Sequence, residues 1–291
     1  MTPGARPAGV HHSAATGFQA GADAYERGRP GFPDDAMVAL ARECGIEPGR
    51  RVVDLAAGTG KLTRQLMPFG AELIAVEPVE SMRRVFAERL PDVPVLDGTA
   101  EALPFEDGSV DAVVASQAFH WFDPAAAPRE IHRALVPFGA LGLVWNVRGE
   151  SVPWVARVTE LMESYRGDTP SFRTGNWRKG LEDGGLFTPL RLLEFLYEQV
   201  MTVDGLVDRV LSVSFMPPFP RASEPRSRPA CGGWSPTSRT SGAARRSRSP
   251  TARTCSSAGP VQNESHCVRS PVSWAYRSSA RARKRARPSA R

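Results

Sequence analysis

The sequence predicts an α/β protein with a doubly wound, mostly parallel sheet between two layers of helices, the three-layer arrangement called Rossmann-like. Three observations predict this fold. Short apolar runs alternate with amphipathic segments from residue 33 to residue 215, a glycine-rich turn follows the first run, and an acid follows the second. Alternating strands and helices favour a parallel sheet because each helix returns the chain to the starting edge.

The expected strands are short runs of aliphatic residues bounded by turn residues. They lie at 51–56, 71–77, 93–98, 110–117, 140–146 and 190–201. The expected helices carry apolar residues three and four positions apart, and several end at a glycine. They lie at 33–45, 59–70, 80–90, 127–139, 152–165 and 202–215. Thr202 is expected to cap the last helix, and Gly139 to take the positive φ before the fifth strand.

Composition divides the chain into a body and a basic tail. Residues 219–291 hold 16 of the 37 lysines and arginines but two of the 31 acids, and neither Leu nor Ile follows Leu211. Such a segment cannot bury enough apolar surface to offset its ordering entropy. We therefore expect a disordered N-terminus (1–19), a folded domain (20–217) and a disordered Arg/Ser/Pro-rich tail (218–291).

The composition of the tail indicates that the sheet lacks its final strand. Arg, Pro and Ser dominate it, as happens when GC-rich coding sequence is translated out of frame. Back-translated with chosen synonymous codons, residues 250–259 read in another frame as an alternating, strand-like segment. A missing strand would leave buried backbone groups unpaired, so that the chain would be poorly soluble or inactive. The nucleotides of the gene test the frameshift.

Charge and hydropathy exclude several classes of partner. The body is net acidic, so only the tail offers an electrostatic footprint for nucleic acid. No apolar run approaches the ~18 residues of a membrane span, and the first residues lack the apolar stretch of a signal peptide. The four cysteines show no paired spacing, so no metal site is expected. We expect a soluble, cytoplasmic monomer that acts on a small molecule without a membrane or nucleic-acid partner.

The stretch VVDLAAGTGKLT predicts a nucleoside-containing cofactor at the carboxyl edge of the sheet. Gly58 and Gly60 let the backbone turn tightly and let a ligand approach it. Glu77 ends the second strand, where an acid can accept hydrogen bonds from ribose hydroxyls. Asp54 ends the first strand; it would repel a pyrophosphate but attract an ammonium or sulfonium group. Thr63 is a poor match for the third small residue of a dinucleotide motif.

Together these motifs resemble those of the class I S-adenosylmethionine-dependent methyltransferases over about residues 20–215. VVDLAAGTG resembles the family's first motif and AVEPVESM its second. LDGTAEALPFEDGSVDAVVASQAFHWFD resembles the third and fourth, and EIHRALVPFGALGLVWN the fifth. AFHWFD and AYERGRPGFP are similar to the branch that includes methyltransferase type 11 and trans-aconitate methyltransferases, which act on small molecules. Phe138 departs from the family, which has a second glycine there.

The resemblance implies S-adenosylmethionine as the cofactor and assigns residues to it. The assigned residues follow the cofactor from its methionine half, through its ribose and adenine, to its reactive methyl group. In this order they are Asp54, Ala56, Gly58, Gly60, Glu77, Met82, Thr99, Ala100, Ser116 and Gln117. Met82 fits a core position on a helix equally well. Thr99 equally fits a loop residue that bonds its own backbone.

His120 is the histidine best placed to act as a general base, because it follows the fourth strand. A phenol or an activated carbon would need such a base, whereas a carboxylate or a free amine would not. His120 fits equally well as a ring packed against Trp121 or bonded to backbone, so its role stays open. Whether the acceptor atom is oxygen, nitrogen or carbon also stays open.

The segment 148–190 is expected to cover the acceptor site as an insertion after the fifth strand. Trp154, Arg173 and Trp177 are candidate lining residues, and Arg173 could pair with a carboxylate. The two tryptophans fit plain packing equally well. Two other classes of function stay open. One is an NAD(P)-dependent oxidoreductase on the same fold. The other is a non-catalytic protein, either a catalytically impaired methyltransferase-like protein or a nucleic-acid binder that uses the tail.

Overall fold

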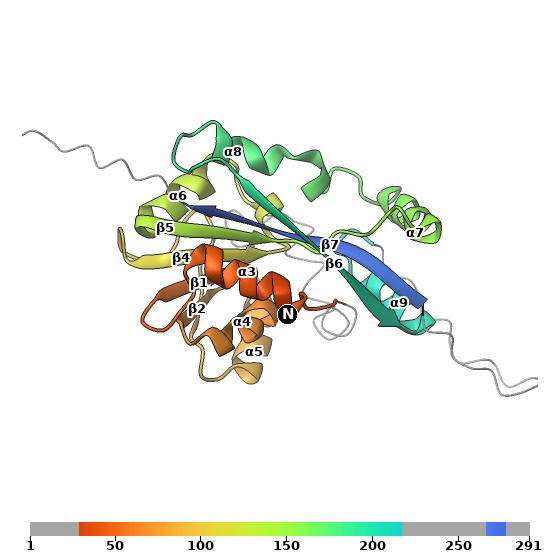
Figure 1. Ribbon diagram of the computed structural model, residues 1–291, viewed down its shortest axis with the longest axis horizontal. Helices are drawn as coiled ribbons and strands as arrows, with labels where there is room; N and C mark the ends of the chain where they lie inside the picture. Colours follow the sequence, from red (N-terminus) through yellow and green to blue (C-terminus); the bar gives the residue numbers. More distant parts are fainter. Residues whose placement is uncertain (1–28, 217–265, 278–291) are drawn as a thin grey trace, which may run out of the picture. The chain divides into compact units, whose positions relative to one another are not determined.

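The computed structural model describes residues 29–216 and 266–277, which form one seven-stranded sheet between two layers of helices (Figure 1). The strand order is β3-β2-β1-β4-β5-β7-β6. Strands β1 to β5 run parallel to one another, and β7 runs antiparallel to both β5 and β6. The predicted Rossmann-like fold class is therefore confirmed.

Strands β1 to β4 and most helices lie close to their predicted bounds, whereas β5 starts at Leu135, inside the helix predicted over 127–139, and neither α8 nor β7 was predicted. The strands are β1 Arg51–Leu55, β2 Glu72–Val76, β3 Val95–Leu96, β4 Val110–Ser116, β5 Leu135–Val144, β6 Arg191–Met201 and β7 His266–Arg277. The helices are α3 Asp34–Cys44, α4 Lys61–Leu66, α5 Glu80–Arg89, α6 Ala126–Ala134, α7 Pro153–Glu163, α8 Lys179–Glu182 and α9 Val203–Leu211. No helix in the described part of the chain is long and apolar enough to cross a membrane.

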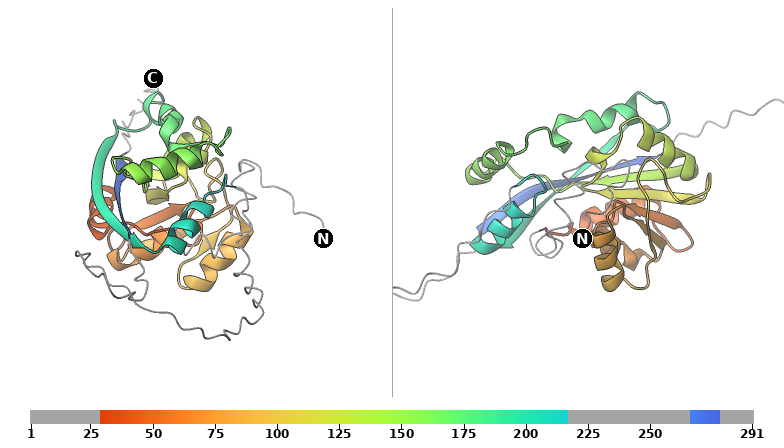
Figure 2. Two further views of the ribbon diagram at one scale, coloured as in Figure 1. Left: turned by 90° about the vertical axis from the view of Figure 1, so that its right-hand side faces the viewer. Right: turned by 180° about the vertical axis from the view of Figure 1, so that it is seen from behind.

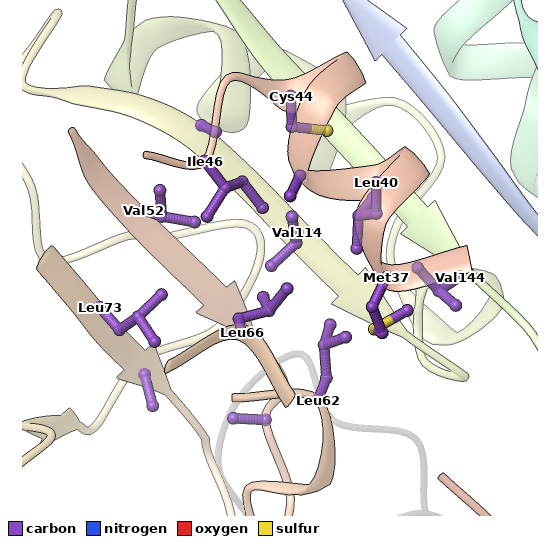
Figure 3. Packing of buried hydrophobic residues seen from close by; sticks show 14 of the residues in the cluster. Met37, Leu40, Cys44, Ile46, Val52, Leu62, Leu66, Leu73, Val114 and Val144 are labelled. Atoms are coloured by element: carbon purple, nitrogen blue, oxygen red, sulfur yellow. The ribbon is translucent and has the colours of Figure 1, made fainter. Parts of the chain in front are cut away.

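The sheet carries a separate apolar core on each face. Helices α3, α4 and α5 cover one face, and α6 and α8 cover the other (Figure 2). Successive strand residues point to opposite faces, so Val52 belongs to the first core and Val53 to the second. In the first core, Leu40 of α3 and Leu66 of α4 lie over Val52 and Val114 (Figure 3).

Helix ends obey the expected local chemistry. The residue after α3, Gly45, is left-handed with φ 64°, and Gly70 ends the turn after α4 with φ 76°. Both are positions where a side chain would be strained. The hydroxyl of Thr202 accepts a hydrogen bond from the Gly205 N–H at 3.1 Å, which confirms the predicted cap of α9.

The expectation of a sheet without its last strand is wrong. β7 lies between β5 and β6, although it belongs to the predicted tail 218–291. Only its last residues pair with β5, from Trp274 to Arg277, whereas the rest pairs with β6 alone. Pro271 lies in this one-sided stretch, where a residue without an N–H is tolerated. The N-terminus 1–19, the tail up to residue 265 and the strand-like segment 250–259 fall outside the described residues.

The turn expected before the fifth strand lies inside β5, at the register shift between Leu135 and Ala140, and it differs from the expectation in one residue. Phe138, not Gly139, has the positive φ, 66°. Gly139 is needed for a close approach, since a Cβ there would lie 2.9 Å from the Val136 carbonyl oxygen and 3.0 Å from that of Asp111. Phe138 is 74% exposed, so its ring gains little from burial while its backbone is strained.

Replacing Phe138 by glycine should stabilise the protein. Removing a side chain from a left-handed residue relieves roughly 1–2 kcal/mol of strain, partly offset by the greater freedom of glycine in the unfolded chain. We expect a net gain of about 1 kcal/mol in the free energy of unfolding, measured by urea denaturation. Phe138→Ala keeps the Cβ and is the control. An equal gain from alanine would show that the exposed ring, not the backbone, is the cause.

Candidate active site

The carboxyl ends of three neighbouring strands bring the predicted cofactor residues to one edge of the sheet. Asp54 of β1 lies opposite Ala75 of β2 and Val114 of β4. Glu77 directly follows β2, and Ser116 is the last residue of β4. In a parallel sheet this edge, beside the first strand, is where ligands bind.

The Glu77 carboxylate joins two backbone segments. Its oxygens accept hydrogen bonds from the N–H groups of Gly58 and Val79, each at 2.9 Å. Burial raises the pKa of Glu77 to about 7, although these two hydrogen bonds act to lower it. The side chain is 5% exposed and lies between the turn after β1 and the start of α5.

Asp54 is a fully buried acid with one unsatisfied oxygen. Its Oδ2 accepts a hydrogen bond from the Thr63 hydroxyl at 2.5 Å. Its Oδ1 has no hydrogen-bond partner among the described residues. Burial raises the pKa of Asp54 to about 7, Thr63 lowers it, and the charge of Glu77 raises it. A buried oxygen without a donor is costly, and a cationic ligand would satisfy it.

The turn after β1 is left-handed at Ala56 (φ 56°), Gly58 (φ 59°) and Gly60 (φ 82°). No described atom lies within 4 Å of the position that a Cβ on Gly58 would take. A Cβ on Gly60 would lie 2.6 Å from Leu90 and 2.9 Å from Phe86. Gly58 therefore leaves space for a ligand, whereas Gly60 makes room for α5. Ala56 holds a conformation that strains a residue with a side chain.

The start of the described chain lines a small cavity beside this turn. The cavity has a volume of about 30 Å³, and its lining includes Arg29, Ala56, Ser116, Gln117 and Asn146. Two hydrogen bonds between Gln65 and the backbone of Phe32, at 2.9 and 2.7 Å, fasten this segment to α4. We call this cavity the cofactor cradle.

The remaining predicted cofactor residues occupy varied positions. Met82 and Ala100 are both 2% exposed, and Ala100 belongs to the second core. Thr99 is half-buried and pairs with Ala102 in an isolated bridge. Contacts of these three with an adenine ring stay a prediction. Gln117 has φ 57° and donates its N–H to the Val144 carbonyl oxygen at 2.8 Å.

A second cavity, of about 130 Å³, adjoins the cradle and shares Arg29, Gln117 and Asn146 with it. We call it the acceptor cavity. Its charged lining consists of five arginines and two glutamates: Arg29, Arg148, Arg166, Arg173, Arg209, Glu150 and Glu163. Most of these residues come from the segment 148–190, which was expected to cover the site.

The charges of the acceptor cavity are only partly paired. Arg166 bonds both oxygens of Glu163, at 2.5 and 2.6 Å, and Arg173 pairs with Glu150. The guanidinium of Arg148 makes no hydrogen bond or ion pair with any described residue. Burial and then the charge of Arg29 lower the pKa of Arg148, with smaller effects from Arg166 and Arg173, while Glu163 raises it. The cavity thus holds a cation that lacks a direct counter-ion within the described structure.

His120 lines the acceptor cavity as a neutral side chain. Its Nδ1 accepts a hydrogen bond from the indole N–H of Trp145 at 3.3 Å. Burial, and to a smaller extent the charges of Arg166 and Arg29, lower the pKa of His120 to about 3. Since Nδ1 accepts, the proton of the neutral ring lies on Nε2, which can only donate. The ring also lies beside Trp121, with centroids 5.3 Å apart.

The other candidates of the insertion separate into lining and packing. Arg173 lines the acceptor cavity, as expected. Trp177 is 3% exposed and bonds the Phe172 carbonyl oxygen, so it packs in the core. Sequence reasoning missed Arg148 and Asn146, which directly follow β5. Their only signal was their position after a strand, at the edge where ligands bind.

A buried acid near the end of β1, a glycine turn open on one side and an acid after β2 form the arrangement that a nucleoside-containing cofactor needs in an α/β protein. Comparison with known proteins identifies the family within this class. The family described as a methyltransferase domain matches residues 53–143. An uncharacterized methyltransferase-like protein of Schizosaccharomyces pombe is 39% identical over 197 residues, which cover 67% of this chain and 77% of that protein. The chain belongs to the class I S-adenosylmethionine-dependent methyltransferases.

Two further proteins are similar over different lengths. An uncharacterized methyltransferase of Mycobacterium bovis is 47% identical over 145 residues, which cover 50% of this chain and 58% of that protein. The crystal structure of the YcgJ protein from Bacillus subtilis has a TM-score of 0.51 and 17% identity, over 84% of this chain and 98% of the other. The latter likeness supports the fold alone.

The buried acids predict an unusual dependence of stability on pH. The folded chain keeps a proton on Asp54 up to about pH 7, whereas the unfolded chain releases it near pH 4. The folded state therefore binds more protons in this window, so this group lowers stability as the pH rises from about 4 to about 7. Asp54→Asn should remove this contribution, at most about 1.4 kcal/mol per pH unit.

Urea unfolding of the parent and of the Asp54→Asn protein at pH 5.5 and 7.5 measures how the free energy of unfolding of each changes with pH. Asp111→Asn is the control, because the pKa of Asp111 is lowered and its carboxyl stays ionised throughout this range. An Asp54→Asn protein with the same pH slope as the parent would contradict the prediction.

Proposed function

We propose that this chain transfers the methyl group of S-adenosylmethionine to an oxygen of a small carboxylate acceptor. One observation carries the choice of acceptor. The arginine-lined cavity adjoins the cofactor cradle and contains Arg148, whose guanidinium has no direct partner among the described residues, beside a histidine that does not accept a proton at neutral pH.

The residues around the cradle fit the cofactor that the family implies. Asp54 offers a buried oxygen that an ammonium group would satisfy, and Gly58 leaves the space that a side chain would fill. Glu77 would hold the ribose hydroxyls with the lone pairs that its two backbone hydrogen bonds leave free. Ser116 and Gln117 line the side nearest the acceptor cavity. When bound, the cofactor supplies an electrophilic methyl group, whose bond to sulfur breaks as the acceptor oxygen bonds to carbon, leaving a neutral thioether.

A carboxylate acceptor matches what the acceptor cavity can do. The acceptor carries no proton at neutral pH, so the transfer leaves none to be removed and His120 need not act as a base. Arg148 would pair with one carboxylate oxygen, and the Nε2–H of His120 could donate to the acceptor as well. Holding an acceptor in line in this way can supply roughly 7–11 kcal/mol of the barrier.

Two substitutions test the cofactor site. Gly58→Val should abolish binding of S-adenosylmethionine, because a branched side chain would fill the cradle. Glu77→Ala should weaken it by about 1–3 kcal/mol, the order for hydrogen bonds to a charged group. Calorimetry measures both. Gly49→Val is the control for backbone strain, since Gly49 is also left-handed with open space around it but lies in the turn before β1. Unchanged affinity in both cradle variants would refute the site.

The acceptor chemistry is tested with labelled cofactor and a panel of small carboxylic acids, amines and phenols. Arg148→Gln should raise KM for acids roughly 10- to 100-fold, because a hydrogen-bonded charge is lost. Arg157→Gln, on the exposed side of α7, should leave KM unchanged. His120→Gln should lower kcat less than about tenfold, whereas loss of a general base would cost roughly 10²- to 10⁴-fold. Turnover of phenols or amines but of no acid would overturn the proposal.

A further inference from the structure

The acceptor cavity continues into an apolar slot between α7 and α9, which also meets the cradle at Pro30 and Asn146. This third cavity, of about 40 Å³, shares Asn146, Val147, Arg148 and Arg209 with the acceptor cavity. Beyond those four residues its lining is mainly apolar: Trp154, Val155, Val158, Met162, Leu206 and Val210. Pro30, together with Gln199 and Met201 near the end of β6, completes it; Figure 1 shows α9 beside this end of the sheet.

We propose that the methyl acceptor is an amphipathic acid, whose carboxylate lies at Arg148 and whose apolar chain lies in the slot between α7 and α9. The inference rests on the proposed function and adds the chemical class of the rest of the substrate. A small, fully polar acid would use the acceptor cavity alone.

Charge fixes the direction in which such a molecule would bind. Arg148 and Arg209 stand where the two cavities meet, so the anionic head is held at the junction. The acceptor cavity meets the cradle at Arg29, Gln117 and Asn146, so a carboxylate at the junction lies beside residues that also line the cradle. The slot offers an alkyl chain apolar side chains on two helices. A reversed orientation would bury the head among Val158, Met162 and Val210.

The length of the slot sets the length of the chain. Its lining residues on α7 run from Trp154 to Met162, which corresponds to roughly 12 Å along the helix. A straight acyl chain of about eight carbons has a similar extended length. Burying each methylene group should improve affinity about fourfold until the slot is filled.

The test titrates the full chain, in the presence of S-adenosylhomocysteine, with straight-chain carboxylates of four, six, eight and twelve carbons. Calorimetry gives the affinity, and methyl transfer from labelled S-adenosylmethionine is measured in parallel. Alcohols of the same lengths separate the contribution of the head from that of the chain. Val158→Phe is designed to fill the slot. Leu161→Phe, at a position 57% exposed on the same helix, is its matched control. Cofactor affinity equal to that of the parent verifies that each variant is folded.

The expected result is a fourfold gain in affinity for each added methylene, levelling off near eight carbons. The gain should be lost in Val158→Phe and kept in Leu161→Phe. The alcohols should bind much more weakly than the acids at every length but gain by a similar factor for each methylene. Acids that are bound and methylated with no dependence on length would overturn the slot but leave the proposed function standing. A dependence on length that survives Val158→Phe would place the chain elsewhere and also overturn the slot. Failure of every acid to bind or react would overturn both proposals.

Discussion

The hydrogen bond from the Gly58 N–H to the Glu77 carboxylate joins the turn after β1 to the end of β2, and the cofactor end of the site depends on it. A buried carboxylate needs such donors, and the Val79 N–H supplies the second. With Glu77 held in this way, α5 starts at a defined place, and Phe86 and Leu90 occupy the space that Gly60 leaves. One buried acid thus positions both the turn and the helix that packs behind it.

The two ends of the site carry opposite charges, and each end is electrostatically incomplete. Burial raises the pKa of Asp54 and of Glu77, so the cofactor end of the site holds acids that ionise readily only beside a cation. Burial and neighbouring guanidiniums lower the pKa of Arg148, so the acceptor cavity favours an anion. Because Gln117 and Asn146 line both cavities, the two ligands would meet there, and each would stabilise the other's charge.

Sequence patterns predicted the first strands of the sheet and the turn after β1 well, because their signals are local. A strand, a glycine turn and an acid at the next strand end lie within thirty residues of one another, and each has one physical interpretation. Arg148 was missed because an arginine after a strand means little until the chain places Arg29 and Arg166 around it. β7 was missed because Pro271 and the absence of Leu and Ile argue against a strand. Phe138 was misjudged because a glycine stood beside it.

The acceptor half depends on long-range pairing instead. In the described structure β6 pairs with β7 alone, and most of β7 in turn pairs with β6 alone, beyond the reach of β5. Helix α9 follows β6 directly and supplies Arg209, Leu206 and Val210 to the acceptor cavity and the slot. Without β7, β6 would expose its backbone groups and α9 would lose its support. The residues that would determine substrate specificity are therefore held in place by β7, which belongs to the part of the chain whose composition is least typical of a folded domain.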